Sequence, residues 1–169
     1  MIQARRVLAV SPHLDDAALS VGALLAGLAS RGTEVHVVTM FAGPPQEPLS
    51  PVARAFHANC GLPGDSTAVV VRHHEDLAAM DVLGARGHHA DLLDAVYRRR
   101  LDGRWLCDHD QAMFDGISAA EDIMTAVSAS AERFWALIVP DLILTCAAVG
   151  GHTVATADLT ARSACRADA

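Results

Sequence analysis

The chain contains no lysine, since all 13 of its basic residues are arginine. This absence excludes mechanisms that need an ammonium group, such as Schiff-base catalysis and the lysine of a phosphate-binding loop. A GC-rich coding sequence would produce the same bias. The formal net charge is -7, so no basic field is available to attract a nucleic-acid backbone. We therefore expect no nucleic-acid partner.

Paired cysteines and long hydrophobic runs are also lacking. The four cysteines form no C-x-x-C pair, which argues against a zinc knuckle and a redox motif. The N-terminal segment MIQARRVLAV lacks a full hydrophobic region and a small-residue cleavage site. No apolar stretch reaches the length of a membrane span without a charge or a break. The sequence predicts a cytoplasmic protein without a membrane partner.

Length and hydropathy indicate one globular domain over residues 1–169. Hydrophobic residues make up 51% of the chain and charged residues 20%, which is the balance of a folded protein with a substantial core. Arg6–Ser11 reads as a buried strand, and Glu34–Phe41 as a second. Between them lies a helical pattern of apolar residues at Val21, Leu24, Leu25 and Leu28. This strand–helix–strand order predicts a parallel sheet covered by helices.

The rest of the chain continues the alternation. Four of the seven prolines fall in residues 43–51, which we expect to be a loop. We expect helices at 51–62, 72–85 and 118–138, and strands at 67–71, from 88 and at 141–152. The predicted fold is an α/β, Rossmann-like three-layer sandwich with a mostly parallel sheet.

The segment SPHLDDAALS places three ionisable groups where the first strand meets the helix: His13, Asp15 and Asp16. An imidazole and a carboxylate are good zinc ligands, and a second carboxylate can serve as general base. The alternative is that one aspartate caps the helix and the histidine is a loop residue. A receiver domain also has an acidic pair here, but it needs a lysine. A dinucleotide fold would need G-x-G-x-x-G between Val10 and Val21, which is absent.

A second group of residues follows the last predicted strand: Gly150, Gly151 and His152. Ligands of open α/β sheets bind at the carboxyl ends of the strands. We therefore expect His152 to meet the first motif at one edge of the sheet.

With these residues in view, the chain resembles the LmbE-like, or PIG-L, family of zinc-dependent N-acetylglucosamine deacetylases. SPHLDDAALS is similar to the family's His-Pro-Asp-Asp-Glu motif, with Leu14 in place of proline and Ala17 in place of glutamate. This variant is similar to a subgroup found among bacterial sugar and natural-product enzymes. RHHEDLAAMDVLGA and LLDAVYRR are similar to two further family segments. The resemblance covers most of the chain.

The resemblance implies roles for individual residues. His13 and Asp16 would bind Zn²⁺, and Asp15 would be the general base acting on the zinc water. Arg72 and Asp94 would bind the hydroxyls of the sugar, although a solvated arginine and a turn residue are equally open interpretations. His152 matches the histidine that stabilises the oxyanion in the family.

The late motif departs from the family pattern His-x-Asp-His, because Val154 and Ala155 stand where its aspartate and second histidine belong. The chain is also shorter at its C-terminus than family members usually are. Three explanations are open. In the first, His152 is the third metal ligand. In the second, another histidine is that ligand, among His73, His74, His88, His89 and His109. In the third, the site is impaired. Neighbours on a helix point about 100° apart, so the adjacent pairs at 73–74 and 88–89 do not chelate a metal easily. We expect both pairs to be partly exposed surface residues.

The resulting hypothesis is a zinc-dependent hydrolase that removes the acetyl group from an N-acetylglucosamine-containing small molecule or glycoconjugate. Its rival is a catalytically impaired homologue that binds a sugar or a partner protein. A homo-oligomer is left open by the sequence.

Overall fold

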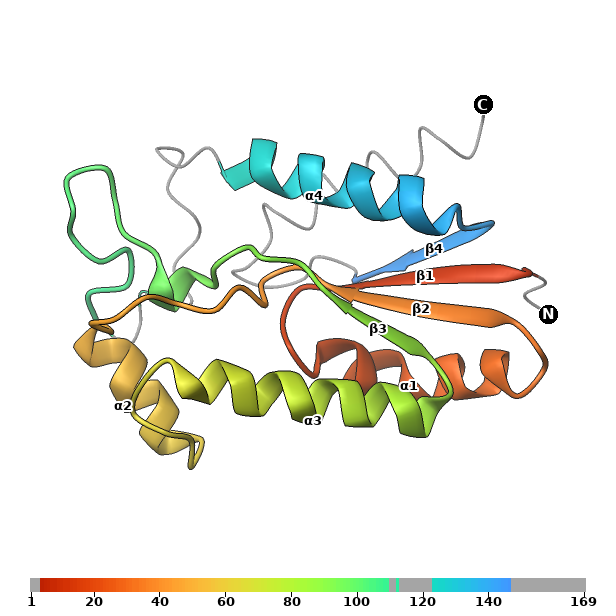
Figure 1. Cartoon of the computed structure of the whole chain (residues 1–169), viewed down its shortest axis with the longest axis horizontal. Coiled ribbons are helices and arrows are strands. Elements are labelled where there is room, and N and C mark those ends of the chain that lie inside the picture. Colours follow the sequence, from red (N-terminus) through yellow and green to blue (C-terminus); the bar gives the residue numbers. More distant parts are fainter. Residues whose placement is uncertain (1–3, 110–111, 113–122, 147–169) are drawn as a thin grey trace.

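The protein is a three-layer α/β sandwich, seen here in a computed structural model that describes residues 4–109, 112 and 123–146. A sheet lies between α4 on one face and α1 and α3 on the other (Figure 1). The elements in chain order are β1 (Arg6–Ser11), α1 (Asp16–Ala29), β2 (Glu34–Thr39), α2 (Pro51–Asn59), α3 (Thr67–Leu83), β3 (Arg86–His89), the 3₁₀ helix η1 (Ala95–Tyr97), α4 (Ile123–Ile138) and β4 (Leu142–Thr145). The predicted fold class is confirmed.

The sheet has the strand order β3-β2-β1-β4, and every pair in it is parallel. The register pairs Ser11 with Thr39 and Thr39 with His89. On the other side of β1, Val10 pairs with Thr145. Three polar residues therefore stand in a row at the carboxyl ends of β1, β2 and β3. This is the edge where ligands of such sheets bind.

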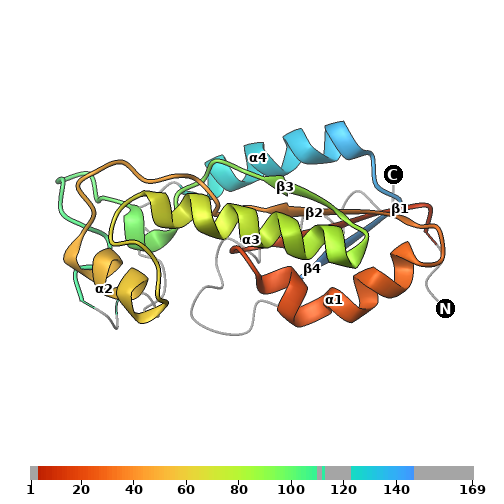
Figure 2. The same cartoon turned by 60° about the horizontal axis from the view of Figure 1, so that its bottom comes forward.

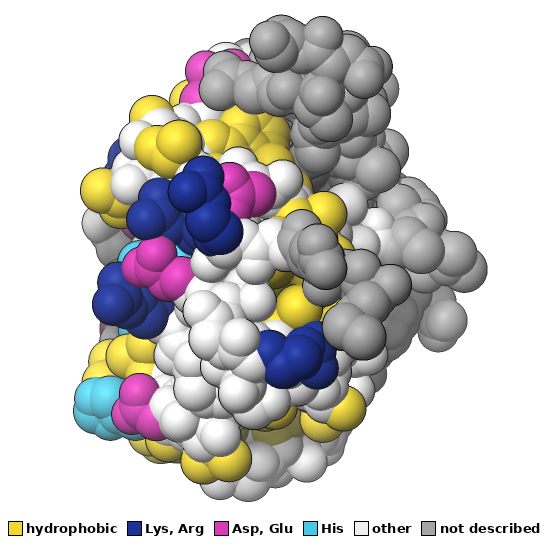
Figure 3. Space-filling view, turned by 90° about the vertical axis from the view of Figure 1, so that its right-hand side faces the viewer, with side chains coloured by type: hydrophobic (Ala, Val, Ile, Leu, Met, Phe, Trp, Pro, Cys, Tyr) yellow, Lys and Arg dark blue, Asp and Glu magenta, His cyan; other side chains and the backbone are white. Residues whose placement is uncertain are grey.

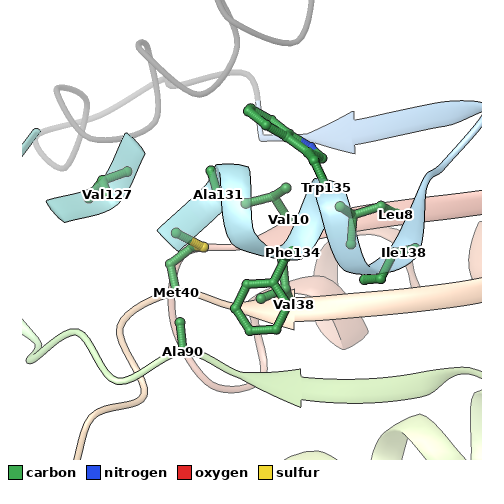
Figure 4. Close-up of a cluster of buried hydrophobic side chains, with 10 residues drawn as sticks. All are labelled: Leu8, Val10, Val38, Met40, Ala90, Val127, Ala131, Phe134, Trp135 and Ile138. Carbon is green, nitrogen blue, oxygen red and sulfur yellow. The ribbon is translucent and has the colours of Figure 1, made fainter. Parts of the chain in front are cut away.

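Both faces of the sheet are buried, which explains why its two central strands are mainly apolar. On one face, side chains of β1 and β2 pack against α4 (Figure 4). This cluster comprises Leu8, Val10, Val38, Met40, Ala90, Val127, Ala131, Phe134, Trp135 and Ile138. The alternate residues of the same strands face α1 and α3, which lie side by side (Figure 2). Leu25 and Leu28 of α1 are fully buried there, whereas Leu24 is partly exposed.

One expected element is wrong: residues 67–71 are the start of α3, not a strand. The valines of this run favour a strand by propensity. However, the Asp65 carboxylate accepts the N–H of Thr67 at 2.9 Å and so satisfies a donor at the helix start. Val69 is 2% exposed and its neighbour Val70 is 47% exposed, so only one face of this segment is buried. The segment continues directly into the helix expected at 72–85.

The opposite end of the sheet, where the strands begin, carries an ion-pair network. Glu34 accepts from Arg6 Nε and from Arg86 Nη1, each at 2.8 Å. Figure 3 views this end, where basic and acidic side chains adjoin. Exposed pairs of this kind add little stability. Within the part of the chain that the structure describes, no helix is long and apolar enough to cross a membrane.

Candidate active site

The turn after β1 is held at both of its ends by one buried hydroxyl. Ser11 Oγ donates to the carbonyl of His13 at 2.8 Å and accepts the N–H of Ala17 at 3.1 Å. Asp15 occupies the N-cap position of α1, yet its side chain makes no capping hydrogen bond, and its φ is 85°. The helix-capping alternative therefore does not describe Asp15, because Ser11 satisfies the helix N–H instead.

His13 and Asp16 form a close pair at this turn. Asp16 Oδ2 accepts the backbone N–H of His13 at 3.0 Å and lies 3.1 Å from its Nδ1. The ring of Phe41 stacks on the imidazole with centroids 5.8 Å apart. Burial lowers the pKa of His13, but the hydrogen bond to Asp16 and the charge of Asp94 outweigh it, so this pKa is raised. Burial opposes ionisation of Asp16, but the hydrogen bonds with His13 lower its pKa overall.

The two side chains fit a zinc ion as donors. Zinc binds imidazole nitrogen and carboxylate oxygen, and two such ligands on one tetrahedral ion stand about 3.3 Å apart. His13 Nδ1 and Asp16 Oδ2 are 3.1 Å apart. The other ring nitrogen, Nε2, lies 4.0 Å from Asp94 Oδ1. A carboxylate on the far side of the ring is the usual partner of a metal-binding histidine.

Asp15 presents its carboxylate to solvent beside this pair. Its side chain is 61% exposed, and its nearest cation is Arg72, whose Nη2 lies 3.7 Å from Oδ2. Burial raises the pKa of the Asp15 carboxyl; Arg72 lowers it, while Asp16 and Asp76 raise it, and the pKa is raised overall. A carboxylate with a raised pKa, open to solvent, is suited to accept a proton.

Asp94 is brought to the site by the segment that precedes η1. Tyr97, at the end of η1, bonds through its hydroxyl to Nε2 of His57 at 2.7 Å. Both rings are buried, and His57 belongs to α2. This contact ties η1 to α2 and so fixes the backbone beside Asp94.

The structure thus brings together five of the predicted residues: His13, Asp15, Asp16, Arg72 and Asp94. His152, with Gly150 and Gly151, lies outside the described residues. The other five histidines that the sequence left open as ligands are all described. Among the residues that the structure describes, no group of three or more histidine, cysteine, aspartate or glutamate side chains forms a metal cluster.

Residues that the sequence did not single out stand directly behind the turn: Asp76, Thr39 and Ser11. Asp76 is buried in α3, and its Oδ1 accepts the N–H of Asp15 at 3.0 Å. Its signal in the sequence is its position four residues after Arg72, which puts both on one face of a helix. Thr39 and Ser11 are the last residues of their strands, at the ligand-binding edge. Their position at the ends of two apolar runs is therefore visible in the sequence.

Comparison with known proteins gives related structures. The crystal structure of the zinc inhibited form of teicoplanin deacetylase Orf2 has a TM-score of 0.84 and 39% identity, covering 96% of this chain and 64% of that one. The A40926 pseudoaglycone deacetylase Dbv21 has a TM-score of 0.75 and 40% identity, with coverage of 96% and 60%.

A curated relative is similar over a shorter stretch. The 1D-myo-inositol 2-acetamido-2-deoxy-alpha-D-glucopyranoside deacetylase of Corynebacterium glutamicum (strain R) is 36% identical over 85 residues, which are 50% of this chain and 28% of that protein. This chain therefore spans less than two thirds of the length of each of these three proteins. The PIG-L family, described as GlcNAc-PI de-N-acetylase, matches residues 8–162. The chain belongs to the PIG-L family.

Proposed function

We propose that this chain is a zinc-dependent hydrolase that removes the acetyl group from an N-acetylglucosamine-containing small molecule or glycoconjugate. The observation that carries the proposal is the donor pair of His13 and Asp16, 3.1 Å apart, beside the exposed carboxylate of Asp15. Family membership and the relatives, each named as a deacetylase, support the same reaction. The relatives' names share the removal of an acetyl group. One of them names a 2-acetamido sugar and the family description names GlcNAc, so we assign this chain a 2-acetamido sugar.

In this proposal His13 and Asp16 hold the ion. When bound, zinc polarises a carbonyl and lowers the pKa of a water molecule. Asp15 takes the proton of the water that attacks the acetamide carbonyl, and the bond from carbonyl carbon to nitrogen breaks. The same carboxyl then returns the proton to the departing amine. The raised pKa of Asp15 favours the first transfer, because a more basic carboxylate binds a proton more readily.

We propose that Asp94 and Arg72 bind the sugar, and both also contact other residues of the site. Asp94 Oδ1 lies 4.0 Å from His13 Nε2, at ion-pair distance and beyond a hydrogen bond. Arg72 donates from Nη2 to the carbonyl of Leu14 at 2.9 Å, and its side chain is 17% exposed. A sugar hydroxyl would meet the exposed part of each side chain. Their contact with substrate stays a prediction, as does His152 as the third ligand.

The formal net charge of the chain is -7, which suits a neutral sugar conjugate as substrate better than a polyanion. Cytoplasmic location stays a prediction.

Acetate release tests the proposal. The purified full chain, supplemented with zinc, is incubated with N-acetylglucosamine and with a glycoside of it, and acetate is measured over time. We expect release that stops after chelation and returns on adding zinc. If the zinc-bound protein releases no acetate from any 2-acetamido sugar, the proposed hydrolase activity is contradicted. Binding of the sugar under those conditions, seen by calorimetry, would instead support the impaired, sugar-binding homologue.

A further inference from the structure

We propose that Asp76 is a positioning residue that fixes the backbone of Asp15, acting with Arg72 as a clamp on the Leu14–Asp15 peptide. This inference rests on the proposed function of Asp15 as the base. Asp76 does not touch the substrate in this scheme, and it acts only by setting where the Asp15 carboxylate points.

The clamp grips one peptide unit from both sides. Asp76 Oδ1 accepts the N–H of Asp15 at 3.0 Å, and Arg72 Nη2 donates to the carbonyl of Leu14 at 2.9 Å. In a trans peptide the N–H and the C=O point in opposite directions. Arg72 and Asp76 are four residues apart in α3, so one helix face supplies both partners. The plane of this peptide is thereby fixed relative to α3.

Fixing this plane matters because Asp15 has an uncommon backbone conformation. Its φ is 85°, in the left-handed region that disfavours residues with a Cβ. Such conformations persist where the surroundings hold them. A carboxylate acceptor is a strong restraint, since hydrogen bonds to ionised groups are about twice as strong as neutral ones. The φ of Asp15 in turn sets the direction of its Cα–Cβ bond relative to this peptide.

Two further elements hold Asp76 in place. Its Oδ2 lies 2.8 Å from His89 Nε2 on β3 and accepts the hydroxyl of Thr39 on β2 at 3.3 Å. Thr39 and His89 are paired in the sheet register at the ligand-binding edge. The ring of His73 packs against His89, with centroids 4.3 Å apart. The position of the Asp15 turn is therefore tied to α3, β2 and β3 through one carboxylate.

The buried carboxylate of Asp76 serves both the sheet edge and the Asp15 turn. Asp76 is 4% exposed, and a buried carboxylate is costly unless hydrogen bonds or a charged partner satisfy it. Burial raises the pKa of Asp76, but the hydrogen bonds from His89 and from the Asp15 N–H outweigh it and leave the pKa lowered. The group is therefore kept charged, and its hydrogen bond to the Asp15 N–H holds the turn that carries the base.

Amide hydrogen exchange at Asp15 tests the clamp directly. Asp76→Ala removes the acceptor, so we expect the Asp15 amide to exchange at least about tenfold faster, while amides of β1 keep their protection. Asp76→Asn keeps an oxygen acceptor without the charge and should show a smaller increase. Asp81→Ala is the matched control, because Asp81 lies exposed on the same helix. Should Asp76→Ala fail to fold, Asp76→Asn decides: an unchanged exchange rate at Asp15 would overturn the proposal.

Kinetics separate positioning from a merely structural role. For acetate release from N-acetylglucosamine, Asp76→Ala should lower kcat by about 10- to 100-fold, with KM and zinc stoichiometry unchanged, and Asp76→Asn should recover most of kcat. An unchanged kcat in folded Asp76→Ala, or a loss of zinc, would overturn the proposal. If the unaltered chain releases no acetate, the proposed function fails, and the exchange rate at Asp15 still decides whether the clamp exists.

Discussion

Asp15→Asn separates the chemistry of the proposed base from its structural environment. Among the described residues, the carboxylate of Asp15 makes one ion pair, at 3.7 Å to Arg72, and 61% of the side chain is exposed. An exposed pair of this kind contributes about 0–1 kcal/mol. Asparagine tolerates a left-handed backbone as aspartate does. We therefore expect the free energy of unfolding to change by less than about 1 kcal/mol, which corresponds to roughly 2–4 °C in Tm at this chain length.

The effect on activity should be far larger. Loss of a general base lowers the rate by about 10²- to 10⁴-fold, which is roughly 3–5 kcal/mol of activation free energy. The assay measures kcat for acetate release, with zinc content and thermal unfolding measured on the same samples. Asp15→Ala serves as a comparison, because alanine at a φ of 85° should cost about 1–2 kcal/mol of stability that asparagine does not.

Two results would refute this reasoning. If Asp15→Asn keeps its kcat, Asp15 is not the base. If it loses zinc in parallel with its activity, Asp15 belongs with the metal ligands, and the separation of roles between Asp15 and Asp16 is wrong.

Three further predictions concern the missing ligand, the acid stability and the core. Ala155→His should tighten zinc binding, measured by competition with a chromogenic chelator, if a lost ligand limits the site; an unchanged affinity would point to a different third ligand. Burial lowers the pKa of His57 in the folded protein, so the unfolded chain binds a proton first as the pH falls below about 6.5. Urea unfolding should show stability lost through this range and a shallower loss in His57→Gln; an identical pH dependence would contradict the assignment. Trp135→Ala should lower the free energy of unfolding by about 3–5 kcal/mol, because the ring is 5% exposed in the core under α4; a loss below about 1 kcal/mol would contradict that packing.

The first strand, helix and second strand could be predicted because their local patterns agree with their burial. Residues 7–10 are apolar and buried on both faces, and Leu25 and Leu28 face the sheet at helical spacing. Thr67–Val71 was mispredicted since its valines favour a strand locally, while the surrounding chain extends them into a helix. Whether such a run pairs in a sheet or covers it is decided by tertiary packing, which propensity does not contain.

The candidate site divides in the same way. His13, Asp15 and Asp16 are contiguous, so their meeting is local and a motif suffices to find them. Asp76 lies 61 residues after Asp15, and its hydrogen bond to the Asp15 N–H depends on how α3 packs beside α1. Asp15's φ of 85° also has no sequence signal beyond the tolerance of aspartate for that conformation. Supporting residues of this kind become visible only when the helices are in place.

Zinc stoichiometry tests most directly whether His13 and Asp16 form a metal site. The full chain is purified after zinc supplementation, and its metal content is measured by elemental analysis, alongside His13→Ala and Asp16→Ala. The control is Asp81→Ala, which removes an exposed carboxylate from α3. We predict about one zinc per chain in the unaltered protein and the control, and loss of zinc in both site variants. An unaltered chain without zinc, or site variants that keep it, would contradict the proposed centre.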